Sequence, residues 1–425
     1  MNKKTVRDID LKGKKVVMRV DFNVPLNEKQ EITDDTRIKA AEPTIKYVLE
    51  QGAALILMSH LGRPKGKVAP EFSLKPCAEY LSKELGKPVQ FAEDCMEADD
   101  QAAALQPGQI LMLENTRFHK GEEGKAKTDG LTDEEAKAKK AEYKALKQEM
   151  AAKLASYGDV YVNDAFGTAH RDHASTCSIC KYMKAKGGPC VAGFLLEKEI
   201  NFLGNAVENA RHPFVAIIGG AKVSGKLEVL KNLMKKVDSI LIGGGMAYTF
   251  LKAKGQKVGA SLCEDDQLAY AKEMLEAAAA KGIKFLLPVD NVVANKFPAE
   301  KDASDVTLKV TEGDIEDGWM GLDIGPKTIA LFSDAIKAAK TVVWNGPMGC
   351  FEFAPLAKGT FGVCDAVATV KANGGLSIIG GGDSVSAVKK SGRAAEMSHI
   401  STGGGASLEY LEGKVLPGVA ALDDK

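Results

Sequence analysis

The stretch "VAIIGGAKVSGKLEVLKNLMKKV", residues 215–237, joins an apolar run of strand length to a glycine-rich turn and a segment with helical periodicity. Short apolar runs alternate with such helix-period segments from one end of the chain to the other. This alternation is typical of a mostly parallel sheet with helices on both faces. The sequence therefore predicts an α/β fold.

The residues that follow the apolar runs divide the chain in two. Arginine and histidine follow them in the first half, as in "LILMSHLGRPKG", and glycine in the second, as in "LSIIGGGDSV". Between the halves, "GFLLEKEINFLGNAVENA" has the pattern of one amphipathic connector helix, and 425 residues exceed one ordinary domain. We expect two doubly wound domains, each a mostly parallel sheet flanked by helices, over residues 1–192 and 211–402, joined by a connector helix over 193–210.

Composition limits the classes of partner. The 57 basic and 57 acidic residues cancel, which argues against a nucleic-acid or membrane protein that acts through a global positive field. Eight scattered cysteines are typical of reduced thiols, and the only C-x-x-C, Cys177 and Cys180, has no second pair at zinc spacing. The N-terminal residues contain no apolar signal core, and no apolar run approaches the ~20 residues of a membrane span. We expect a soluble, cytoplasmic protein.

Two helices have recognisable ends in the sequence. In "SLKPCAEYLSKELG", Ser73 is a candidate N-cap and Gly86 a C-terminal stop. The charged segment that ends near Gly158 opens with a Thr132/Glu135 capping box, and its dense charge indicates a solvated helix face.

In open α/β sheets, ligands bind beyond the carboxyl ends of the strands. Several arginines there are costly unless an anion neutralises them, and the planar guanidinium suits carboxylate and phosphate. We interpret these side chains as a clamp for a small, multiply anionic substrate, the alternative being unrelated surface salt bridges. The strand-end residues of the first half are Arg19, His60, Arg63, Arg117, His119, His170 and Arg171.

The glycine-rich ends of the second half favour phosphate, because glycine lets backbone N–H groups and helix N-termini approach it closely. Residues 220–227 almost match a P-loop, but Leu227 stands where a Ser or Thr would hold Mg²⁺. The dinucleotide fingerprint fails twice, at Tyr248 and at Val385, which counts against a nicotinamide-dependent dehydrogenase.

Lys222 and Lys226 lie four residues apart where the strand turns into the helix, so both can reach phosphates. Asp383 follows a glycine triplet and is a candidate Mg²⁺ ligand, with an N-cap for the next helix as the alternative. The histidines do not have metal-ligand spacing, and for His119 and His173 we expect a surface role. A clamp in one domain and a nucleotide-phosphate cradle in the other together predict phosphoryl transfer between two separately bound substrates.

Eight motifs in order then carry a resemblance along the whole chain: "RVDFNVP", "SHLGRPKG", "ENTRFHKGE", "VNDAFGTAHR", "GGAKVSGK", "WNGPMGCFE", "GGGDS" and "STGGGASLEYL". Through them the chain resembles the phosphoglycerate kinase family. The resemblance implies reversible transfer of the acyl phosphate of 1,3-bisphosphoglycerate to MgADP, giving 3-phosphoglycerate and ATP, by a monomer without nucleic-acid or membrane partners. A catalytically silent nucleotide-binding protein of the same fold is the alternative.

The resemblance also implies roles for individual residues. The matching phosphoglycerate-binding positions are Asp21, Asn23, Arg37, His60, Arg63, Arg117 and Arg171. Those of the nucleotide site are Lys222, Lys226, Gly243, Gly244, Gly245, Gly325, Asn345, Glu352, Gly381, Gly382, Asp383 and Ser384, with Glu352 at the ribose and Asp383 at Mg²⁺. Catalysis is assigned to Arg37, Lys222, Gly381 and Gly404. Residues 403–425 are expected to return to the N-terminal domain, with a hinge at the connector helix and at Gly403–Gly405.

Three positions depart from the family's pattern. Gly225 stands where the family usually has Asp, so a carboxylate that orders the lysine loop is missing here. Ser384 replaces a common Thr and keeps the hydroxyl, and Cys350 replaces Val, which we expect to be a packing change. The P-loop match arises mainly from Gly225. We interpret it as a chance match within a phosphate site of another kind.

Overall fold

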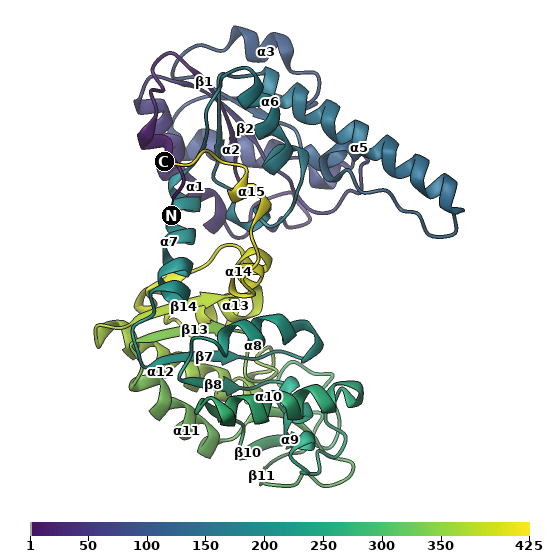
Figure 1. Cartoon of the computed structure of the whole chain (residues 1–425), viewed down its shortest axis with the longest axis vertical. Helices are drawn as coiled ribbons and strands as arrows, with labels where there is room; N and C mark the ends of the chain where they lie inside the picture. Colours follow the sequence, from purple (N-terminus) through teal and green to yellow (C-terminus); the bar gives the residue numbers. More distant parts are fainter. Residues whose placement is uncertain (1) are drawn as a thin grey trace. The chain divides into compact units, whose positions relative to one another are not determined.

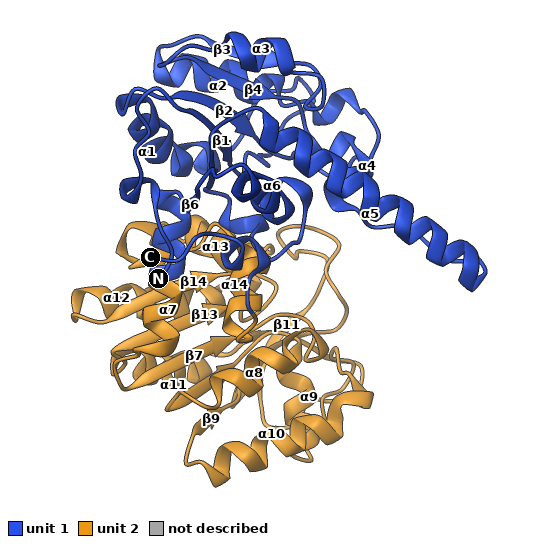
Figure 2. Ribbon diagram, turned by 45° about the horizontal axis from the view of Figure 1, so that its top comes forward, with its two compact units in different colours: residues 1–201, 415–425 blue, residues 202–414 orange. Residues whose placement is uncertain are grey.

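The computed structural model describes residues 2–425 and divides the chain into two compact units, coloured separately in Figure 2. Unit 1 extends from the N-terminal residues to Asn201 and includes Val415–Lys425, and unit 2 comprises Phe202–Lys414. Residues 403–414 therefore belong to unit 2, and the final segment joins unit 1 from Val415, later than the expected boundary at 403. No helix within the described range is long and apolar enough to cross a membrane.

Unit 1 is built on a six-stranded sheet in which all pairs are parallel. In Figure 1 this unit is coloured purple to teal, apart from its yellow C-terminal segment. The order β3-β4-β2-β1-β5-β6 places β1 and β2 at the centre. Side chains of the central strands are buried on both faces, as expected for a sheet with helices on either side. The strands are β1 (Lys15–Arg19), β2 (Ala54–Met58), β3 (Val89–Ala92), β4 (Ile110–Leu113), β5 (Val160–Asn163) and β6 (Cys190–Ala192).

The helices of unit 1 test the predicted ends. Thr132 and Glu135 form the expected capping box at the start of α5, whereas Ser73 is not the N-cap of α2. That N-cap is Leu74. The Ser73 hydroxyl, one residue earlier, accepts from the Lys75 N–H at 3.2 Å and donates to the Glu114 carboxylate at 2.6 Å. Gly86 ends α2 in the left-handed conformation, as predicted. The helices are α1 (Thr36–Glu50), α2 (Lys75–Leu85), α3 (Asp99–Ala104), α4 (Lys120–Glu123), α5 (Asp133–Ser156), α6 (Ile179–Ala185) and α15 (Pro417–Ala420), with short 3-10 segments such as η3 (Thr116–Phe118) and the π-helical η5 (Ala174–Ser178).

Unit 2 contains a second six-stranded parallel sheet, in the order β15-β14-β13-β7-β8-β9. Trp344 on the central strand β13 is fully buried, and its indole Nε1 donates to the Gly346 carbonyl at 2.7 Å. The two parallel sheets confirm the predicted fold class. The strands are β7 (Phe214–Ile218), β8 (Ser239–Ile242), β9 (Lys284–Leu286), β13 (Thr341–Asn345), β14 (Leu376–Gly380) and β15 (His399–Ile400).

A small antiparallel sheet of unit 2 was not predicted. The run "FLLPVDN" contains the end of β9 and the start of β10, which belong to different sheets. The order is β11 (Leu308–Glu312), β10 (Asp290–Ala294), β12 (Met320–Ile324). The helices of unit 2 are α8 (Leu227–Leu233), α9 (Met246–Ala253), α10 (Leu268–Ala280), α11 (Pro326–Lys337), α12 (Lys358–Ala372), α13 (Gly382–Lys390) and α14 (Gly404–Leu411).

The segment that was expected to connect the domains forms one helix, α7 (Phe194–Glu208), and the division between the units falls inside it. The buried carboxyl of Asp164 holds its first turn: Oδ1 accepts from the backbone N–H groups of Leu195 (2.8 Å) and Leu196 (3.1 Å). Burial raises the pKa of Asp164 to about 7, although the N–H donors favour its charged form.

This raised pKa makes stability depend on pH. The carboxyl titrates near 3.8 in the unfolded chain and near 7 in the folded one, so its ionisation opposes folding. Ionisation of Asp164 lowers the free energy of unfolding. This loss is absent below about pH 4 and complete above about pH 7, and a difference of about three pKa units corresponds to at most about 4 kcal/mol. Asp164→Asn keeps an acceptor and cannot ionise. We expect its free energy of unfolding, relative to wild type, to rise between about pH 5 and about pH 8 in urea titrations.

The matched control is Asp129→Asn, because Asp129 is exposed. Its difference from wild type should stay constant over the same pH range. A constant difference for Asp164→Asn as well would show that this carboxyl does not titrate between the two states.

Candidate functional site

The carboxyl ends of the central strands of unit 1 lie at one edge of the sheet, because Arg19 pairs in register with Met58 and with Asn163. Asp21 follows β1, and Arg37 lies in the first turn of α1. Arg37 Nη1 is 2.9 Å from both carboxylate oxygens of Asp21. The Arg37 side chain is 35% exposed and that of Asp21 only 9%. The carboxylate therefore orients a guanidinium whose other nitrogens can face a ligand.

The loop after β2 is held by two further predicted residues. Asn23 Oδ1 accepts from the Gly62 N–H at 2.9 Å, and Arg117 Nη1 donates to the Gly62 carbonyl at 3.0 Å. A side chain at Gly62 would be strained, because φ is +61° and a Cβ would lie 2.3 Å from the Phe72 ring. Asn23, Arg117 and the loop thus form one group with Asp21, whose Oδ1 lies 3.3 Å from the Asn23 N–H.

His60 joins this group as a neutral imidazole. Its Nδ1 lies 3.2 Å from Arg19 Nη2 and 3.9 Å from Asp21 Oδ1. Burial lowers the pKa of His60 well below its usual value, and the charges of Arg19, Arg117 and Arg37 lower it further. Because an arginine can only donate, Nδ1 accepts from Arg19 and Nε2 carries the proton. His60 can therefore donate one hydrogen bond to an anion.

Arg19 is the strand-end arginine that does not belong to a clamp. It is fully buried and donates to the Ser175 hydroxyl at 2.8 Å and to the Val20 carbonyl. Glu122, also fully buried, lies 3.9 Å from Arg19 Nη2 and accepts from the Ser175 hydroxyl at 2.5 Å. Neither Glu122 nor Ser175 lies at a strand end, so no pattern in the sequence predicted this supporting network.

Other predicted residues of unit 1 differ in exposure. Arg63 and Arg171 are both exposed, and they lie in the chain segments that follow β2 and β5. The expectation of a surface role is wrong for His173, which is 8% exposed with Nδ1 3.9 Å from Glu122. His119 lies beside Asp94, at 2.8 Å.

In unit 2 the glycine-rich turns also meet at one sheet edge, because Asn345 pairs in register with Ile218 and with Gly380. The turns approach so closely that side chains are excluded. A Cβ on Gly244, at φ +72°, would lie 2.7 Å from the backbone N and O of Gly220. The predicted Gly243–Gly245 turn is therefore packed directly against the turn after β7, with backbone forming the surface.

The two lysines of the predicted cradle differ. Lys226, the N-cap residue of α8, is hydrogen-bonded through Nζ to Asn345 Oδ1, so two predicted residues are in contact. Burial lowers the pKa of Lys226, while the carboxylates of Asp383 and Glu412 act in the opposite direction. Lys222 is exposed in the loop between β7 and η6 (Ser224–Lys226). Lys226 thus supports the site, and Lys222 is available to a ligand.

The start of α13 excludes one of the two interpretations of Asp383. The N-cap is Gly381, at φ +89°, so the alternative that Asp383 caps this helix is wrong. Asp383 is exposed in the first turn, and Ser384 Oγ accepts from the Gly346 N–H at 2.6 Å. An exposed carboxylate beside glycine-rich turns fits Mg²⁺, which takes one or two carboxylates together with phosphate and water.

Three other predicted residues of unit 2 lie at Gly404, Gly325 and Glu352. Gly404 begins α14, and a Cβ on it would lie 3.3 Å from the Gly382 nitrogen. Gly325 is the N-cap of α11, packed against the Asp290 carboxylate, and Glu352 is exposed after β13. Its neighbour Cys350 packs in a small apolar cluster, consistent with the expected packing role.

Two doubly wound units, one with guanidinium and imidazole groups at a sheet edge and one with a glycine-lined edge bearing lysine and aspartate, are the arrangement of a phosphotransferase of the α/β kinase class. The family model described as phosphoglycerate kinase matches residues 6–414. The chain belongs to the phosphoglycerate kinase family.

Known proteins support this assignment over the full length. The phosphoglycerate kinase of Chlorobium phaeobacteroides (strain BS1) is 54% identical over 426 residues, covering 100% of both chains. That of Clostridium perfringens (strain SM101 / Type A) is 53% identical over 429 residues, covering 100% of this chain and 99% of the relative. The solved structure from Coxiella burnetii has a TM-score of 0.84 at 39% identity, and that from Pyrococcus horikoshii OT3 a TM-score of 0.77 at 32%. Each covers 99% of this chain and 98% of its own.

The activity follows from these findings. The chain is a phosphotransferase that transfers the acyl phosphate of 1,3-bisphosphoglycerate reversibly to ADP, giving 3-phosphoglycerate and ATP. None of the matches favours a catalytically silent protein.

Proposed function

We propose that the strand-end group of unit 1 binds the phosphoglycerate. The observation that carries this is the shared network of Asp21, Asn23, Arg37, His60 and Arg117 at one sheet edge. It presents guanidinium and imidazole donors suited to phosphate and carboxylate. Arg63 and Arg171 complete the proposed site from exposed positions.

The glycine-rich edge of unit 2 binds the nucleotide in this proposal. Backbone N–H groups of the turn at Gly381–Gly382 face the phosphates. Gly243–Gly245 line the edge, and the N–H groups of Gly243 and Gly244 hold their turn by donating to the Ile218 and Met348 carbonyls at 3.1 and 2.8 Å. Lys226 and Asn345 support the edge, and Ser384 fixes the turn after β13. We assign Gly325 and Glu352 to the part of this site that holds the nucleoside, with Glu352 at the ribose. Asp383 would hold Mg²⁺, which supplies charge neutralisation on the nucleotide phosphates.

The chemistry needs no general base. In the direction that consumes ATP, the nucleophile is the carboxylate of 3-phosphoglycerate, which is ionised at about pH 7. What remains is positioning and stabilisation of charge on the equatorial oxygens of the transferring group. We assign Arg37 and Lys222 to that group, and the N-terminal backbone of α13 and α14, at Gly381 and Gly404, to the same task.

The direct test of this function uses purified protein, MgATP and 3-phosphoglycerate, with hydroxylamine to trap acyl phosphate. We expect hydroxamate to form only when both substrates are present. Binding of MgADP without any hydroxamate would indicate the silent alternative.

The P-loop coincidence leads to a prediction about Mg²⁺. If Asp383 holds the metal, Asp383→Ala should raise the Mg²⁺ concentration for half-maximal activity about tenfold or more, the loss expected when a direct charged contact is removed. Leu227→Thr, which completes the P-loop pattern, should leave it unchanged, because in this proposal the metal is held at the start of α13 and not at the first residue of α8. The reverse pattern in a Mg²⁺ titration would restore the P-loop interpretation.

Because the proposed substrate sites belong to different units, transfer requires closure that brings the reacting atoms within about 3.5 Å. We place the bending at α7 and at Gly403–Gly405. Small-angle scattering should give a smaller radius of gyration with both substrates bound than with either alone. Identical scattering under turnover conditions would contradict the hinge.

The protein acts, in this proposal, as a cytoplasmic monomer whose partners are its small-molecule substrates. The support is indirect: all eight cysteines are free, as expected in a reducing compartment, and the charge balance is neutral. Sedimentation of the purified protein would test the monomer.

A further inference from the structure

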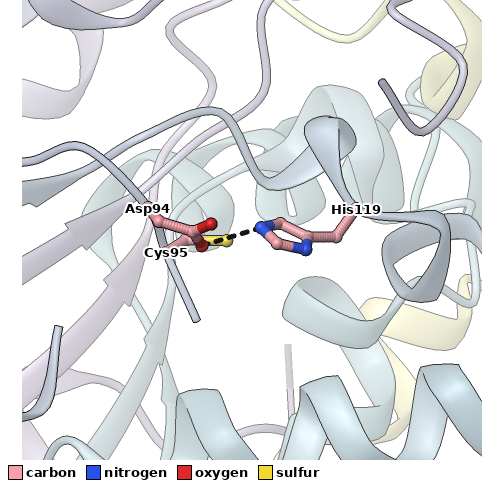
Figure 3. A group of neighbouring side chains, drawn as sticks. All are labelled: Asp94, Cys95 and His119. Carbon is pink, nitrogen blue, oxygen red and sulfur yellow. Dashed lines mark hydrogen bonds and ion pairs between the residues drawn. The ribbon is translucent and has the colours of Figure 1, made fainter. Parts of the chain in front are cut away.

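A second polar cluster lies in unit 1, at the ends of the neighbouring parallel strands β3 and β4. Asp94 and Cys95 follow β3, and His119 follows η3 after β4. One possible ligand atom from each of the three residues lies within 4.8 Å of the others. Figure 3 shows the carboxylate and the sulfur facing the imidazole ring. His119 lies 24 positions beyond Cys95 and 25 beyond Asp94, so no local sequence motif indicates the cluster.

The chain holds these side chains in place through its backbone. The Tyr157 hydroxyl donates to the Cys95 carbonyl at 3.0 Å and accepts from the Ala98 N–H at 3.2 Å. Asp94 Oδ1 accepts from the Met96 N–H at 2.7 Å. On the other side, the His119 N–H donates to the Thr116 carbonyl at 3.3 Å. The three groups are therefore placed by two ordered turns and not by the His119–Asp94 pair alone.

Access to the cluster is from one side. Cys95 is 1% exposed, whereas the side chains of His119 and Asp94 are 32% and 37% exposed. An ion arriving from solvent would meet the carboxylate and the imidazole first and the sulfur beneath them.

We propose that Asp94, Cys95 and His119 form a binding site for a thiophilic divalent metal of the zinc class. One sulfur, one nitrogen and one oxygen donor match the ligands of zinc, with water in the fourth position. The same set disfavours Mg²⁺, which prefers oxygen ligands, so this site is distinct in chemistry from that proposed at Asp383. In a tetrahedral zinc site the ligand atoms are about 3.3–3.6 Å apart, which small side-chain rotations can reach from the observed spacing.

Binding would form metal–sulfur, metal–nitrogen and metal–oxygen bonds, with the thiol proton released to solvent. The metal would tie the end of β3 to the turn between β4 and α4. Its expected effect is to stabilise unit 1, because an ion that binds only the folded chain raises the unfolding temperature.

The test uses the full chain, stripped of metal with a chelator and kept reduced. Zn²⁺ is titrated in competition with a chromophoric chelator, and Co²⁺ serves as a spectroscopic probe of thiolate ligation. We expect one equivalent of Zn²⁺ to bind, a sulfur-to-cobalt charge-transfer band, and a higher unfolding temperature with Zn²⁺. Cys95→Ser and His119→Gln should each weaken Zn²⁺ binding at least tenfold, the effect typical of removing a ligand or its support.

The controls are matched in chemistry. His212→Gln removes a His–Asp pair without a thiol, whose Nδ1 lies 2.6 Å from Asp238 Oδ2, and Cys177→Ser removes the partly exposed member of the C-x-x-C. Both should bind Zn²⁺ as wild type does. Unchanged binding in His119→Gln, whose side chain is partly exposed and dispensable for packing, would overturn the proposal even if Cys95→Ser failed to fold. A cobalt band lost in Cys177→Ser but kept in Cys95→Ser would overturn it as well.

Discussion

Lys222→Ala should lower kcat about a hundredfold while leaving the affinity for MgADP within a few fold of wild type. Lys222 is exposed in the loop that leads into α8, whereas Lys226 is already hydrogen-bonded to Asn345. The charge of Lys222 is therefore available to the transferring phosphoryl group, where negative charge develops in the transition state. Removal of one such contact costs on the order of 3 kcal/mol.

Steady-state kinetics with both substrates saturating, and calorimetric titration with MgADP, give the two quantities. Lys235→Ala is the matched control, because Lys235 is an exposed lysine just beyond α8. It should retain wild-type kcat. A Lys222→Ala enzyme with normal kcat, or one in which only the MgADP affinity falls, would refute the role in the transition state.

Gly244→Ala should destabilise unit 2 by about 2–4 kcal/mol and abolish tight nucleotide binding. The residue has φ +72°, which costs an alanine about 1 kcal/mol, and its Cβ would lie 2.7 Å from backbone atoms of Gly220. A backbone atom cannot move aside as a flexible side chain can. The turn after β8 must therefore shift away from the turn after β7, which breaks the hydrogen bonds from Gly243 and Gly244 to Ile218 and Met348 and displaces the backbone proposed to line the nucleotide site.

Gly225→Ala provides the comparison within the same site. A Cβ at Gly225 meets no atom within 4 Å, and the residue lies in the 3-10 turn before α8. This substitution should leave stability unchanged or slightly raised, since alanine favours helical backbone more than glycine does. Urea unfolding and nucleotide titration of both variants give the answer. Equal effects at the two positions would mean that the close approach at Gly244 is not what fixes the turn.

Local sequence signals predicted much of the fold. The alternation of apolar runs and helix-period segments gave both parallel sheets, and the Thr132/Glu135 capping box set the start of α5. These features depend on residues close together in sequence, for which periodicity and capping chemistry are direct evidence. The anion-binding edge was also foreseeable, because strand ends in a parallel sheet converge.

What the sequence did not reveal depends on contacts between distant segments. Ser73 has the chemistry of an N-cap, yet its hydroxyl donates to Glu114, 41 positions away. Arg19 has the position of a clamp residue, yet Ser175 and Glu122 hold it in the core. The strands of the antiparallel sheet, β10–β12, do not alternate regularly between buried and exposed residues, so no local pattern separates them from neighbouring apolar runs.

The buried indole of Trp344 makes unit 2 optically distinct from unit 1. The chain has two tryptophans, and both Trp319 and Trp344 lie in unit 2. Tryptophan emission therefore reports the unfolding of unit 2 alone, while far-ultraviolet circular dichroism reports the helices of both. Comparison of the two signals during a single urea titration distinguishes a chain that unfolds as one cooperative block from one whose halves unfold separately.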